Sequence, residues 1–91
     1  MGVAWFTREQ WALVRAAAVD PEGLKSTYER WLTMAEDGFV KLSAAGCQPE
    51  MVHLDANELA LWCESEGRPL DSGARAAFAA HKLRLLKDEA P

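Results

Sequence analysis

The side chains that most readily bind a metal or act as nucleophiles are two cysteines, Cys47 and Cys63, and two histidines, His53 and His81. Together they have the composition of a Cys2His2 zinc site. Structural zinc sites usually take two ligands from one turn, as in Cys-x2-Cys or His-x3-His, because a knuckle must present both ligands together. No two of these four residues are so closely spaced. The spacing therefore predicts no metal site, and we expect no cofactor.

The same residues are poor candidates for nucleophilic catalysis. A reactive thiolate needs an electropositive, partly exposed setting. Cys47 follows the expected end of a helix, where the partial negative charge disfavours a thiolate, and Cys63 lies on an apolar helix face. His53 and His81 are best interpreted as packing or hydrogen-bonding residues. The carboxylate pair Glu36-Asp37 falls on a face expected to be solvated. We predict no catalytic residues and a protein that is not an enzyme.

The element expected to organise the chain is one long amphipathic helix over residues 20–46. Asp20 is a suitable N-cap, Pro21 suits the first helical position, and Gly46 suits a left-handed residue after the last turn. Apolar residues at helical spacing form a single stripe on it. This stripe consists of Leu24, Tyr28, Trp31, Leu32, Ala35, Phe39 and Leu42.

The remaining elements follow from capping signals and alternation. Thr7 with Gln10, and Asp55 with Glu58, are spaced as capping boxes at the start of two helices. We expect helices at about residues 8–19, 56–66 and 72–87, and one strand at 50–54. The fold class is therefore mostly α, with four helices in all, arranged around the long amphipathic one, and a short strand between the second and third. Residues 1–91 should form a single domain, with 1–6 and 88–91 frayed.

The apolar faces of these helices predict the core of the domain. Its members are expected to be Trp11, Val14, Leu24, Tyr28, Trp31, Leu32, Phe39, Leu42, Leu59, Trp62, Cys63, Phe78 and Leu85.

The strand at 50–54 requires a partner, because a single strand leaves its backbone donors and acceptors unpaired. It can pair with the apolar segment 2–6, which also leads into a capped helix, with its own copy in a second chain, or with water alone. We favour pairing between two chains, since a two-stranded ribbon across a two-fold axis is a natural dimer seam.

Composition and charge restrict the class of protein. The chain has 91 residues, 49% of them hydrophobic, a net charge of −4 and four tryptophans, which is typical of a small globular domain. Two cysteines and the absence of a signal peptide favour a reducing compartment. No apolar run is long enough to cross a membrane. We expect a cytoplasmic protein with no membrane partner.

The basic residues are concentrated near the end of the chain. Segment 68–87 contains five Lys or Arg against Asp71 alone, whereas 1–67 contains five against eleven Asp or Glu. The last two helices could form a helix-turn-helix whose second helix, 72–87, enters a DNA groove. Ser72, Gly73 and Arg75 would be a thin set of base-reading residues, and the overall charge is acidic. DNA binding is therefore the alternative hypothesis, and nucleic acid is not the expected partner.

Three short segments resemble a family of short uncharacterised bacterial proteins. These segments are Thr27-Tyr28-Glu29-Arg30-Trp31-Leu32, Leu61-Trp62-Cys63 and Ala74-Arg75-Ala76-Ala77-Phe78. Members of that family carry a Tyr-Glu-x-Trp helix, a valine-rich strand, a Trp-Cys helix and a terminal Ala-Arg helix, so the similarity covers about residues 7–83. It implies a bacterial, cytoplasmic, stand-alone protein and brings no activity or ligand.

The function that these observations favour is a non-enzymatic protein–protein interaction module that associates with itself. The unpaired strand needs a partner, and the chain holds more aromatic area than so small a core requires. We expect a homodimer, or a complex with another protein. The residues expected at the contact are Trp5, Phe6, Met51 and His53.

Overall fold

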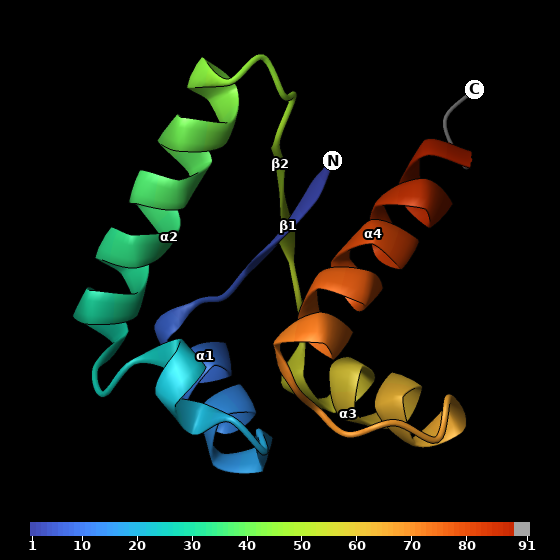
Figure 1. Cartoon of the computed structure of the whole chain (residues 1–91). Coiled ribbons are helices and arrows are strands. Elements are labelled where there is room, and N and C mark those ends of the chain that lie inside the picture. Colours follow the sequence, from blue (N-terminus) through green and yellow to red (C-terminus); the bar gives the residue numbers. More distant parts are fainter. Residues whose placement is uncertain (89–91) are drawn as a thin grey trace.

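The computed structural model describes residues 1–88 and places two short strands between helices (Figure 1). In chain order the elements are β1 (Gly2–Trp5), α1 (Arg8–Ala17), the 3-10 turn η1 (Pro21–Leu24), α2 (Tyr28–Ala44), β2 (Glu50–His53), α3 (Ala56–Ser65) and α4 (Ser72–Asp88). The protein is therefore mostly helical, as predicted, but with two strands rather than one. The expectation of fraying at 88–91 concerns mostly residues 89–91, which lie outside the described residues.

Both predicted capping boxes begin helices. The Thr7 hydroxyl accepts a hydrogen bond from the Gln10 N–H at the start of α1, and the Asp55 carboxylate accepts one from the Glu58 N–H at the start of α3. The Gln10 side chain serves the other helix, because its Oε1 accepts from the Ala56 N–H at 2.7 Å. One glutamine thus joins the first turns of α1 and α3.

The prediction of one continuous helix over residues 20–46 was wrong at its beginning. Residues 21–24 form only the turn η1, Lys25 has a left-handed φ of 66°, and α2 starts after Thr27, whose hydroxyl caps the Arg30 N–H. Two side chains of α1 stabilise this interruption of the helix. Trp11 Nε1 donates to the Leu24 carbonyl, and Arg15 Nε donates to the Lys25 carbonyl. These carbonyls are bound to α1 instead of continuing a helix.

The strand after α2 pairs within the chain. β1 and β2 run parallel, with Gly2 opposite Glu50 and Trp5 opposite His53. We had favoured pairing of segment 50–54 with a second copy, but the edge of β2 that faces β1 pairs with segment 2–6 of the same chain. The segment 1–6 is not frayed, because it supplies a strand of the sheet.

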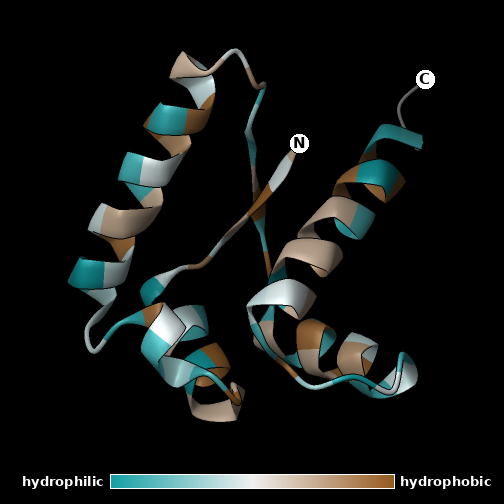
Figure 2. Ribbon diagram, viewed as in Figure 1, coloured by the Kyte–Doolittle hydropathy of each residue, from teal (hydrophilic) through white to brown (hydrophobic). Residues whose placement is uncertain are grey.

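The sheet lies between α2 and α4, which stand on opposite sides of it in Figure 1. The backbone of β1 approaches α4 so closely that a Cβ on Gly2 would lie 2.8 Å from the Ala79 carbonyl oxygen. Trp5, which points to the other face, makes edge-to-face contacts with Trp31 and Phe39 of α2. The strands thus join the two long helices, and hydrophobic residues of β1 occupy the crossing (Figure 2).

The core confirms most of the predicted α2 stripe and adds residues from both strands. Val14, Leu24, Trp31, Leu59, Cys63 and Phe78 are buried, and most of the other predicted members are half-buried. Leu85 was predicted to be buried and is 49% exposed, because it lies one turn beyond His81, where the aromatic contacts of α4 with Trp62 of α3 end. The buried residues that the prediction omitted include Trp5, Phe6, Val52, Leu54, Leu70, Ala74 and Ala79.

Candidate interaction surface

The two strands leave one free hydrogen-bonding edge each. The Met1 carbonyl accepts from the Glu50 N–H, and the Trp5 carbonyl accepts from the Leu54 N–H. Neighbouring residues of a strand direct their backbone groups to opposite edges. The odd-numbered positions of β1 therefore face β2, and Gly2 and Ala4 face away from it. By the same alternation, Met51 and His53 direct their N–H and C=O groups away from β1.

The free edge of β2 is exposed to solvent. Met51 is 47% exposed and His53 is also exposed. One of the edge groups already has a partner, because Lys82 Nζ of α4 donates to the His53 carbonyl at 3.3 Å and forms an ion pair with Glu58. The N–H and C=O of Met51 and the N–H of His53 point outward.

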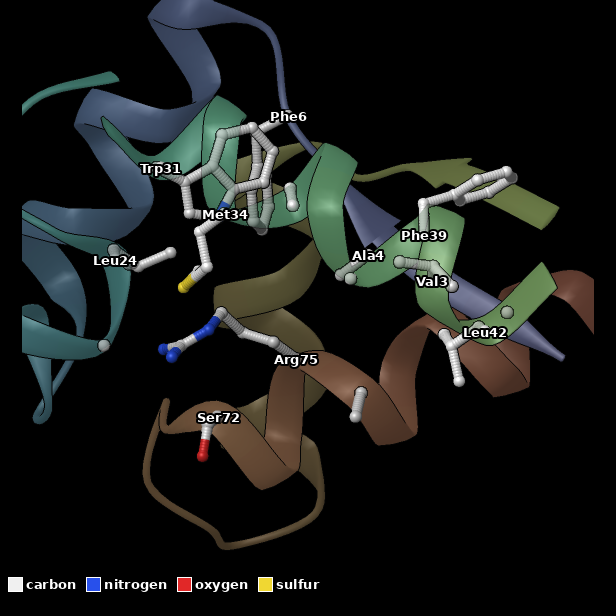
Figure 3. Close-up of a pocket in the computed structure, with 15 residues that line it drawn as sticks. Val3, Ala4, Phe6, Leu24, Trp31, Met34, Phe39, Leu42, Ser72 and Arg75 are labelled. Carbon is white, nitrogen blue, oxygen red and sulfur yellow. The ribbon is translucent and has the colours of Figure 1, made fainter. Parts of the chain in front are cut away.

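The free edge of β1 lies in a groove of about 350 Å³ between α2 and α4 (Figure 3). Its floor is residues 2–4. The wall from α2 is apolar, and the wall from α4 contributes two polar side chains, those of Ser72 and Arg75. The α2 residues that line it are Trp31, Met34, Ala35, Gly38, Phe39 and Leu42.

Among residues 1–88, Arg75 is the only charged side chain lining this groove, and its charge is neutralised. Arg75 is 6% exposed, and its guanidinium binds both carboxylate oxygens of Asp20, at 2.9 and 3.4 Å. The same carboxylate accepts from the Ser72 N–H at the start of α4. The hydrogen bond from Arg75, with a smaller contribution from Ser72, holds the pKa of Asp20 below its ordinary value. A fixed ion pair therefore closes the end of the groove near η1.

The four residues predicted at a contact surface separate into two pairs. Trp5 and Phe6 are 7% and 2% exposed and pack against Trp31, so they have almost no surface to offer a partner. Their aromatic area is used in the core, because β1, which contains Trp5 and leads directly into Phe6, packs between α2 and α4 instead of fraying. Met51 and His53 lie together on the exposed edge of β2.

The residues considered for metal or nucleophilic chemistry are not brought together. Cys47 is exposed in the connector after α2, whereas burial of Cys63 raises the pKa of its thiol. The ring of His81 stacks on those of Trp62 and Phe78, and that of His53 lies at the strand edge. Across residues 1–88 there is no group of three or more His, Cys, Asp or Glu side chains that could hold a metal ion.

The basic residues near the end of the chain are mostly engaged. Arg75 binds Asp20, Lys82 binds Glu58, and Lys87 binds Glu50 at 3.1 Å. These basic side chains form ion pairs within the protein, whereas a DNA-binding helix would direct them to phosphates. DNA binding by residues 72–87 stays a prediction, and the arrangement of these charges does not favour it.

No protein-family model, curated protein or solved structure matches this chain. The resemblance to short bacterial proteins therefore stays a prediction. In the part of the chain that the structure describes, no helix combines the length and the apolar character needed to cross a bilayer.

Proposed function

We propose that this protein is a non-enzymatic interaction module that forms a homodimer through the free edge of β2. The observation that carries the proposal is the exposed edge itself, where Met51 and His53 present backbone groups and Met51 presents an apolar side chain to solvent. Exposed strand edges readily pair with another strand unless they are covered or charged. Here β1 pairs with one edge of β2 and leaves the other open except at the His53 carbonyl, which accepts from Lys82 of α4.

The geometry of such a dimer follows from the register. In an antiparallel β2–β2 pair, residues whose backbone groups point outward must oppose one another. Met51 then lies opposite His53 of the partner subunit, and a two-fold axis passes between the two copies of Val52. The result is a continuous four-stranded sheet, in which the same patch on each subunit meets its copy.

The expected affinity is moderate. Such a pair exchanges about four backbone hydrogen bonds, two of them to the His53 carbonyls that already accept from Lys82. Each bond contributes about 1 kcal/mol, while association costs several kcal/mol in lost freedom. Burial of the two Met51 side chains must therefore contribute part of the favourable free energy of dimerisation. We expect a dissociation constant on the order of micromolar.

Sedimentation of two variants at one position tests the proposal. Met51→Pro removes an outward-pointing N–H while leaving the β1–β2 ladder intact, because proline is tolerated on a free strand edge. It should abolish the dimer and preserve the circular dichroism spectrum. Met51→Ala keeps the donor and should only weaken the dimer. A wild-type protein that remains monomeric at high micromolar concentration, or a Met51→Pro variant that dimerises normally, would contradict the proposal.

A further inference from the structure

The floor of the groove beside β1 has backbone groups without partners. Gly2 and Ala4 direct their N–H and C=O groups to this edge, and within residues 1–88 no backbone or side-chain hydrogen bond involves them there. Gly2 and Ala4 are half-buried, and backbone groups buried away from water are rarely left unpaired in proteins. In a strand, the backbone groups of every second residue point to the same edge, so an adjacent strand could form hydrogen bonds with both Gly2 and Ala4.

The walls specify the chemistry of an occupant. The lining side chains are apolar apart from Ser72 and Arg75, and the charge of Arg75 is already balanced by Asp20. Neither an anion nor a cation would find an unmatched counter-charge there. The groove thus combines apolar walls with a hydrogen-bonding floor, which is the arrangement found where a sheet edge accepts an extended peptide.

We propose that this groove binds an extended, uncharged segment of a partner protein, which adds to β1 as a third strand of the sheet. Gly2 and Ala4 would exchange backbone hydrogen bonds with the segment. The volume of about 350 Å³ is enough for about two or three residues of the segment. Because successive side chains of a strand point to opposite faces, its apolar side chains would face α2 and α4 in turn. This edge lies on the opposite side of the sheet from Met51, and the proposal is therefore independent of the proposed homodimer.

Two other occupants fit the groove less well. An acyl chain would cover the apolar walls but leave the backbone groups of Gly2 and Ala4 unpaired. A second copy of this chain would have to offer the free edge of its own β2. That edge is flanked by Lys82 and Lys87 of α4, whose ammonium groups would enter an apolar groove.

The position of Gly38 supplies a variant that blocks the groove without disturbing the core. Gly38 lines the groove from α2, and a Cβ built there meets nothing within 4 Å. The side chain of Gly38→Leu would therefore extend into open space where the peptide is proposed to lie. Ala44→Leu adds the same side chain to α2 at an exposed residue outside the groove and is the matched control. Ala76→Leu blocks the groove from the opposite wall.

The experiment selects binders from a displayed library of random seven-residue peptides on the full chain and then measures synthetic copies of the enriched sequences. We expect enrichment of peptides with uncharged, apolar residues at alternating positions. Their affinity should fall at least tenfold in Gly38→Leu and in Ala76→Leu, and less than twofold in Ala44→Leu. The amide of Ala4 should exchange with solvent at least tenfold more slowly in the complex, and Met51→Pro should bind the peptides normally.

Several results would overturn the proposal. These are a selection without binders, peptides with helical spacing of apolar residues, and affinity unchanged by both blocking variants. Exchange at Ala4 that does not slow on binding would also overturn it, since an acyl-like or side-chain-only contact leaves that amide open. If Gly38→Leu converts a self-associated wild type to monomer while the peptides fail to bind, the occupant is a second copy and the proposal fails.

Discussion

The guanidinium of Arg75 in α4 and the carboxylate of Asp20 in the corner after α1 form a bond at 2.9 Å that joins residues 55 positions apart. A further backbone bond at this corner runs from the Val19 N–H to the Leu70 carbonyl. The ion pair thus holds the start of α4 against the first half of the chain and shapes one end of the groove beside β1.

Replacing Asp20 by asparagine should destabilise the protein by about 3 kcal/mol, near the lower end of the range for breaking a buried ion pair. The cost arises because Arg75 has a side chain only 8% exposed and would lose its counter-charge, whereas Asp20 is 26% exposed. Chemical denaturation of the two proteins measures the difference.

The control for this variant is the double substitution Asp20→Asn with Arg75→Met, which removes the stranded charge. It should recover part of the lost stability, because a well-packed apolar residue can replace a buried ion pair at little cost. A double variant less stable than Asp20→Asn alone would show that Arg75 acts mainly through packing of its apolar stem.

The stability of the protein should fall at acidic pH partly through Asp20. Its pKa is lowered in the folded state by the hydrogen bond from Arg75, so the unfolded chain binds this proton more tightly. The contribution is fully present above the ordinary pKa of 3.8 and is lost as the pH falls through the lowered value. The stability gap between wild type and Asp20→Asn should therefore narrow when thermal unfolding is compared at pH 6 and at about pH 2. If the difference in stability between the two proteins stays constant over this pH range, the destabilisation by Asp20→Asn arises from an interaction other than the ion pair with Arg75.

Two glycines should respond oppositely to alanine. Gly2→Ala places a Cβ 2.8 Å from a backbone oxygen of Ala79, so the strand or α4 must shift, at a cost of about 1–3 kcal/mol. Gly38→Ala meets nothing within 4 Å inside α2 and should stabilise the protein by about 0.5–1 kcal/mol. Thermal denaturation of both variants checks the pair, and equal effects of the same sign would contradict the close packing of β1 on α4.

The helix boundaries show which parts of the fold can be predicted from neighbouring residues alone. The hydroxyl and carboxylate caps at Thr7 and Asp55 act through neighbouring residues, and the sequence predicted both helix starts. The break at Lys25 depends on Trp11 and Arg15 binding carbonyls 13 and 10 positions away. The apolar spacing of Leu24 and α2 continues across that break, which is why periodicity alone predicted one helix. The Ser-Thr pair before Tyr28 was the available signal for a cap.

The strand pairing and the groove depend on contacts distant in sequence. Both strand segments were recognisable as apolar runs before capped helices, but only 50–54 was predicted as a strand. The choice between pairing within and between chains needed the positions of α2 and α4. Once β1 lies between them, Trp5 and Phe6 become core residues instead of contact residues. The groove could not be predicted, since Gly2, Gly38 and Arg75 carry no shared sequence pattern and meet only in the folded chain.

The two cysteines should differ strongly in reactivity. Cys47 is exposed in the connector between α2 and β2, whereas Cys63 is 4% exposed within the core. Burial raises the pKa of the Cys63 thiol, with the nearby charges of Arg68 and Asp71 acting in opposite directions, so both access and thiolate content are low there. A thiol-specific reagent at pH 8 should label one cysteine rapidly in the native protein and both in denaturant.

The residual labelling of Cys63 then reports the opening of the core. Reaction at Cys63 requires α3 to detach from the core or the chain to unfold, so its rate should lie at least about a hundredfold below that of Cys47 if opening costs about 3 kcal/mol or more. Cys47→Ser should eliminate the rapid phase and leave the slow one. In Asp20→Asn the slow phase should accelerate in proportion to the lost stability, because the loosened corner begins α4. Rapid labelling of Cys63 in the native wild type would mean that the core around Cys63 is open in the folded protein.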